Sequence, residues 1–184
     1  MGWLGKPCRK PATAKEEAEM VIERFLEGWG DKPPKMLRHK VVASTLYAKM
    51  ESTLKDGSKR LWIAVVLFQW NKRELWLKYM DNTVGPNYHD CPSSWFKDIP
   101  VANDYDREWR EKVLDKERRL RQAKTVKAGD VVKFNCPYGE TDTWEYTGDG
   151  DLFASSVGGE VCKLRNWRNN FLCFVSRAGK EAKP

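Results

Sequence analysis

Residues 61–68 read Leu-Trp-Ile-Ala-Val-Val-Leu-Phe and form the longest apolar run in this chain of 184 residues. The run is too short to span a bilayer and is typical of a strand buried on both faces of a sheet. Asp56-Gly57 precedes it and Asn71-Lys72 follows it, and both pairs suit tight hairpin turns. The pattern predicts a central strand in an antiparallel meander, with neighbouring strands at residues 41–50 and 74–80.

Helices are predicted before and after this meander in the chain, with at least one packed on the sheet. Thr13 and Glu16 form a capping-box pattern, and apolar residues then recur at helical spacing up to Trp29. Residues 32–40, which read Lys-Pro-Pro-Lys-Met-Leu-Arg-His-Lys, are predicted to be a basic loop. A short helix around Trp95 is expected to dock back on the sheet.

The second half of the chain changes character twice. Residues 104–124 predict a long charged helix, in which Tyr105, Trp109 and Val113 form a docking stripe and the later turns are solvated. From Lys127 onward, five short segments rich in strand-forming residues are separated by glycine turns, which predicts a small five-stranded β-barrel. The expected class is α+β: an α/β module (1–103), a linker helix (104–126), the barrel (127–177) and a tail (178–184).

The net charge of +7 is unevenly distributed along the chain. Residues 1–126 contain 25 Lys/Arg and 18 Asp/Glu, whereas residues 127–184 contain 8 of each. Long-range attraction of a polyanion is therefore expected at the first module and its helix. Basic side chains gather at the end of that helix and again beside a tryptophan. The candidate residues for binding nucleic acid or another partner are Arg118, Arg119, Arg121, Lys124, Arg165, Trp167 and Arg168.

Known catalytic and metal-binding motifs are missing from the sequence. It contains no phosphate-binding glycine-rich loop and no cysteine–histidine spacing that suits zinc, so no metal and no other cofactor is predicted. The densest cluster of reactive side chains lies in residues 81–91. A hydrolase or transferase using Asp81, His89, Asp90 and Cys91 is one hypothesis; a purely structural loop with a buried Cys91 is the other, and is favoured.

The cysteines and the start of the chain indicate a compartment. Five widely spaced cysteines make a poor disulfide framework, and the first residues lack the apolar stretch of a signal peptide. The sequence therefore predicts a cytoplasmic protein that makes no contact with a membrane.

Several short motifs carry a resemblance. They are Met-Gly-Trp-Leu at the start, Asp-Asn-Thr-Val-Gly-Pro at 81–86, Asp-Cys-Pro at 90–92, Tyr-Asp-Arg-Glu-Trp-Arg at 105–110 and Asn-Trp-Arg at 166–168. In these motifs the chain resembles an uncharacterised family of small phage- and plasmid-encoded proteins. The resemblance implies a bacterial host cytoplasm but no particular activity.

We therefore expect an accessory protein of a mobile element, which binds nucleic acid or a host defence protein without catalysis. The alternatives of an inhibitor that binds another protein and of a nucleotide sponge, both acting against host immunity, remain open.

Overall fold

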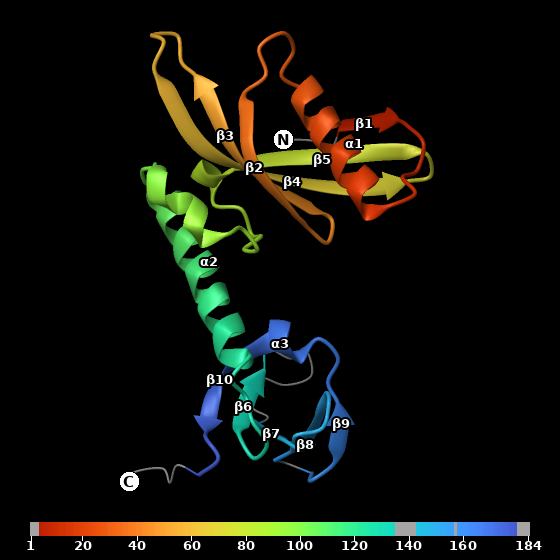
Figure 1. Ribbon diagram of the computed structural model, residues 1–184, viewed down its shortest axis with the longest axis vertical. Coiled ribbons are helices and arrows are strands. Elements are labelled where there is room, and N and C mark those ends of the chain that lie inside the picture. The colour runs from red at the N-terminus through yellow and green to blue at the C-terminus, as the bar shows by residue number, and fades with distance from the viewer. Residues whose placement is uncertain (1–3, 135–142, 157, 180–184) are drawn as a thin grey trace. The chain divides into compact units, whose positions relative to one another are not determined.

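The computed structural model describes residues 4–134, 143–156 and 158–179 (Figure 1). The chain divides into two compact units, Met1–Leu114 and Asp115–Pro184, called here the N-terminal and C-terminal units. Each unit is built on a five-stranded antiparallel sheet. The predicted α+β class is therefore correct, but two other parts of the predicted fold are wrong.

The N-terminal sheet has the strand order β1-β5-β4-β3-β2. Its strands are β1 (Leu4–Pro7), β2 (Lys35–Val42), β3 (Thr45–Thr53), β4 (Lys59–Asn71) and β5 (Glu74–Asp81). The apolar run lies in β4 at the centre of the sheet, as predicted. Because alternate residues of a strand point to opposite faces, β4 supplies Ala64, Val66 and Phe68 to one core and Ile63 and Val65 to another.

Helix α1 (Ala14–Glu27) covers the first face and buries Val21 and Phe25 in the first core. The Thr13 side chain caps it by accepting a hydrogen bond from the Glu16 backbone N–H (3.1 Å), as the sequence predicts. Glu16 reaches back, and its Oε2 accepts a hydrogen bond from the Ala12 N–H (2.6 Å). This bond, together with Arg9, holds the pKa of the Glu16 carboxyl below its usual value.

Replacement of Thr13 by Ala is expected to lower the free energy of unfolding by about 1 kcal/mol, because the Glu16 N–H loses its acceptor. Urea denaturation followed by circular dichroism measures the change. Thr13→Asn restores a capping oxygen and is expected to stay close to the wild type. Equal stability of the wild type and Thr13→Ala would show that the cap contributes nothing.

The second face of the sheet is covered by elements that follow β5 in the chain. These are the 3₁₀ turns η1 (Asn82–Val84) and η2 (Ser93–Asp98) and the first half of helix α2 (Asp104–Ala123). Trp95, Trp109 and Val113 pack there against Tyr47 and Ile63 in the second core. The docking of Trp95, Trp109 and Val113 is as predicted, but Tyr105, the first residue of the predicted docking stripe, is exposed.

The prediction of an independent linker helix at residues 104–126 is wrong. The first half of α2 belongs to the core of the N-terminal unit through Trp109 and Val113. At its other end Ala123 is 1% exposed and packs with Val132 and Phe134 in the core of the C-terminal unit. The helix thus contributes to the cores of both units. Its contribution to the second core was not predicted, because the residue of α2 that makes it is a single alanine.

The prediction of a closed β-barrel is also wrong. The C-terminal sheet contains β6 (Val131–Phe134), β7 (Thr143–Tyr146), β8 (Leu152–Ser155), β9 (Val161–Lys163) and β10 (Phe171–Ser176). The strands lie close to their predicted positions, but their order is β10-β6-β7-β8-β9, and within the described part of the chain β9 and β10 do not pair. The sheet is open. Trp167, on the short helix α3 (Trp167–Asn170), packs against Phe134 and Phe153 and completes the core in place of a closing ladder.

The basic segment 32–40 differs from its prediction too, because most of it is strand β2. This strand pairs with β3 from Lys35 to Val42 and is an edge of the sheet. Most of its side chains are exposed, which removed the alternation on which strand prediction depends. Lysine and arginine on an edge strand discourage pairing with other chains. A turn at Ala43, whose φ is +49°, separates β2 from β3.

Candidate nucleic-acid interface

The tryptophan singled out in the sequence is a core residue. Trp167 is 2% exposed, packs edge-on against Phe134, and its indole N–H donates to Asp151 Oδ1 (3.0 Å). A base therefore has no access to the ring itself. The indole instead supports Arg168, whose guanidinium carbon lies 4.3 Å from the ring centroid. A guanidinium in this position over the ring face makes a cation–π contact.

Three basic side chains lie around helix α3 and define what we call the α3 surface: Lys163, Arg165 and Arg168. All three are exposed, and none has an ion pair with a described carboxylate. One acid lies close to this surface. It is Asp151, whose carboxylate accepts the hydrogen bond from Trp167. Asn166, just before the helix, has a φ of +57°, which turns the chain sharply between Arg165 and Arg168.

The C-terminal unit is strongly segregated in charge along its sequence. Residues 161–180 contain five Lys/Arg and no Asp/Glu, whereas residues 135–160 contain six Asp/Glu and no Lys/Arg. The basic part includes both edge strands, β9 and β10, and helix α3 between them. A count over the whole segment from residue 127 gives zero net charge and hides this division. Windows of about twenty residues would have found it.

The basic end of helix α2 is partly neutralised. Arg118 and Arg119 both form ion pairs with Asp115, the latter at 2.9 Å. The hydrogen bond from Arg118, with Arg119 beside it, holds the pKa of the Asp115 carboxyl below its usual value. Arg121 and Lys124 are exposed and have no ion pair among the residues described here. The α2 end therefore offers less free positive charge than the sequence indicates.

A second stacked arginine lies at the end of strand β10. The guanidinium carbon of Arg177 is 3.6 Å from the centroid of the Phe174 ring, and its Nη2 donates to Thr125 Oγ1 (3.1 Å). Arg177 was not among the binding residues predicted from the sequence. It lies three residues after an aromatic residue in the acid-free segment, and this spacing could have indicated a stacked arginine.

The loop considered for catalysis is tied to the protein backbone. Asp81 Oδ1 accepts a hydrogen bond from the Thr83 N–H (2.9 Å) and caps η1. Cys91 is 1% exposed and belongs to the second core. The Asp90 N–H donates to the hydroxyl of buried Tyr47 (3.2 Å), and burial raises the pKa of that hydroxyl.

The four residues of the catalytic hypothesis are divided between two environments. Asp81 accepts a hydrogen bond from Tyr79 (3.4 Å), which packs on the α1 face of the sheet, whereas Cys91 lies in the core of the other face. His89 and Asp90, both half-buried, adjoin Cys91 in the chain. The sheet therefore separates the Asp81 carboxylate from the Cys91 thiol.

In the portion of the chain that the structure describes, no three His, Cys, Asp or Glu side chains are grouped so that they could hold a metal ion. No helix there is long and apolar enough to cross a membrane. Comparisons of the chain with models of protein families, with curated proteins and with solved structures found no match.

Proposed function

We propose that the protein binds single-stranded nucleic acid, without catalysis, on the α3 surface of its C-terminal unit. The observation that carries the proposal is Arg168 lying over the Trp167 ring, close in the chain to Arg165 and Lys163, in a segment of twenty residues without an acid. A guanidinium held over a ring leaves its other face exposed. Any of the bases can stack on that face.

The two neighbouring cations supply the electrostatic part of this binding. Lys163 and Arg165 carry charges free to contact phosphates, which gives affinity without base recognition. The acids of residues 135–160 repel a polyanion. A nucleic-acid strand is therefore expected to bind only to the basic part of the unit. This arrangement suits binding that is tolerant of sequence and sensitive to salt.

A salt titration with a fluorescent oligothymidine of about 15 nucleotides tests the proposal. The double variant Arg165→Ala/Arg168→Ala is expected to flatten the plot of log K against log salt by about 1.4, because two positive charges beside the bound strand are lost. Arg118→Ala/Arg119→Ala is the matched control: it removes the same formal charge, but from arginines that already share Asp115. A clearly smaller change is expected for the control.

A conservative variant separates stacking from charge. Arg168→Lys keeps the charge but not the planar group, so weaker binding with an almost unchanged salt slope is expected. Equal slopes for both double variants would contradict a site at α3. Failure of the wild type to bind the oligonucleotide at low salt would contradict the function.

A further inference from the structure

The N-terminal sheet contains a gap beside its central strand. Strand β4 pairs with β3 from Lys59 onward, but its pairing with β5 begins only at Ala64, opposite Asp81. Residues 59–63 therefore have a neighbouring strand on one side alone. The open side is identified by the Ile63 N–H, which points away from β3 and donates to Asn82 Oδ1 (3.0 Å).

Backbone alternation then places a second set of polar groups at this gap. In an antiparallel pair, residues two apart direct their N–H and C=O groups to the same side. The N–H and C=O of Leu61 consequently face the open side with those of Ile63. No hydrogen bond to either group of Leu61 is found on that side within the described structure.

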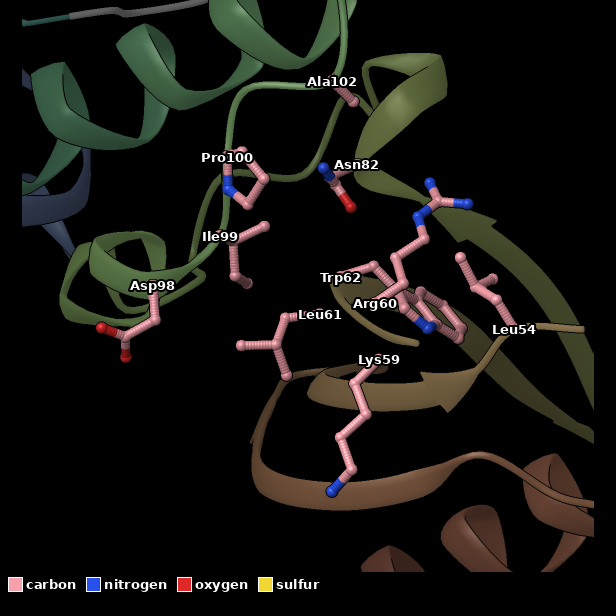
Figure 2. Close-up of a pocket in the computed structure, with 10 residues that line it drawn as sticks. All are labelled: Leu54, Lys59, Arg60, Leu61, Trp62, Asn82, Asp98, Ile99, Pro100 and Ala102. Atoms are coloured by element: carbon pink, nitrogen blue, oxygen red, sulfur yellow. The ribbon is translucent and has the colours of Figure 1, made fainter. Parts of the chain in front are cut away.

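A pocket of about 530 Å³ occupies this gap (Figure 2). Leu61 and Trp62 of β4 line it on one side, and Ile99 and Pro100, from the segment that leads into α2, line it on the other. Pockets of this size are typical of sites for small ligands or short peptides. All its lining residues belong to the N-terminal unit.

Asn82 directs a free donor to the pocket. Its side chain is 1% exposed, and the bond from Ile63 fixes the amide oxygen toward β4. The amide nitrogen must then point the other way, and Figure 2 shows it on the side of Pro100 and Ala102. Among the residues described, none accepts a hydrogen bond from this nitrogen. A carbonyl or carboxylate bound in the pocket could accept a hydrogen bond from this nitrogen.

The charges around the pocket favour an anionic group. Lys59 is paired with Glu51 (3.0 Å), and Asp98 is paired with Lys49 (3.2 Å). Arg60 is exposed and has no ion pair within the described chain. In Figure 2 its guanidinium and the Asn82 amide lie at the same end of the pocket, away from Lys59. The pocket therefore combines an open strand edge, a buried amide donor and one unpaired guanidinium.

We propose that a short extended peptide carrying a carboxylate binds here as an added strand beside β4, independently of the nucleic-acid site. Its backbone would pair with the N–H and C=O of Leu61, the Asn82 amide would donate to a peptide oxygen, and Arg60 would bind the carboxylate. At about 3.3 Å per residue, the gap beside residues 59–63 accommodates roughly three to five peptide residues. Alternate peptide side chains would pack against Trp62 on one face of the sheet and Ile99 on the other.

The test uses a fluorescein-labelled library of pentapeptides in which Thr, Val, Ile and Leu vary over four positions and the last residue is Glu. Fluorescence anisotropy measures their binding to the full chain. Arg60→Gln is expected to weaken the best peptide at least about tenfold, since a charge-assisted bond is lost. Lys55→Gln, which removes an exposed cation from the same hairpin outside the pocket, is expected to leave affinity within about twofold.

Two further experiments distinguish binding of the peptide as an added strand from simple binding of an anion. N-methylation of the peptide amide that pairs with Leu61 is expected to abolish binding, because the bond to the Leu61 carbonyl is lost. AMP and citrate are expected not to compete. Unchanged affinity of every N-methylated peptide, displacement by AMP or citrate, or no binding of any library member at about 1 mM would each overturn the proposal.

Discussion

Replacement of Asp106 by Ala is expected to lower the free energy of unfolding of the N-terminal unit by about 3–5 kcal/mol. Asp106 is fully buried, and its carboxylate accepts hydrogen bonds from Arg110 (2.8 and 2.9 Å) and from the Ala102 N–H (2.9 Å). The Ala variant leaves Arg110, which is 8% exposed, without its counter-ion. An uncompensated buried charge is among the most destabilising changes a protein can carry.

The expected loss is measured by urea denaturation, with two variants as controls. Asp104→Ala removes an exposed acid that pairs with Arg107 in the same helical turn, so a change below about 1 kcal/mol is expected. Asp106→Leu/Arg110→Met removes both charges and is expected to recover part of the stability, although the carbonyls of Ile99 and Pro100 lose their donor. If Asp106→Ala were no less stable than Asp104→Ala, the buried pair would not be a determinant of this unit.

Replacement of Trp167 by Ala is expected to destabilise the C-terminal unit by about 3–5 kcal/mol. The indole contacts Phe134, Tyr146 and Phe153, with ring centroids 5.1–6.2 Å away. The variant would leave a cavity among these rings and deprive Asp151 of its bond from the indole N–H. The strands of this unit are short. A loss of about 3–5 kcal/mol approaches the whole free energy of unfolding of a small domain.

Thermal unfolding monitored by near-UV circular dichroism measures this effect. Trp167→Phe keeps an aromatic group in the core and is expected to lose clearly less than the Ala variant. Arg168→Ala removes only the cation above the ring and is expected to change stability by less than about 1 kcal/mol. A Trp167→Ala protein with the melting curve of Arg168→Ala would show that the ring does not hold the core together.

Local patterns in the sequence predicted most of the elements but not their assembly. The apolar run in β4 and the Thr13 cap carry strong short-range signals, and both were located correctly. Strand β2 was missed because an exposed edge strand has no buried face and hence no alternation. Closure of the barrel was predicted from the number of short strands and the glycine turns between them, although it depends on pairing between β9 and β10, which no local pattern encodes.

The candidate sites show the same limit. Arg165, Trp167 and Arg168 were selected from their adjacency, but only the structure shows that Trp167 is buried and that Arg168 lies on it. The pocket beside β4 was not foreseen, because it results from β5 ending at Asp81 while β4 continues to Lys59. Hydrophobic patterns indicate where a strand is buried, but not how far it extends beyond the end of its partner.

Helix α2 also decides how the chain can be dissected. A fragment ending before residue 104 would lack Trp109 and Val113, and one beginning after residue 123 would lack Ala123. Only a cut inside α2, between Val113 and Ala123, leaves each half with these buried side chains. Such a cut gives each unit about half of the twenty-residue helix. Helical segments that short are marginal in water by themselves, so each half-helix would depend on packing against its own unit.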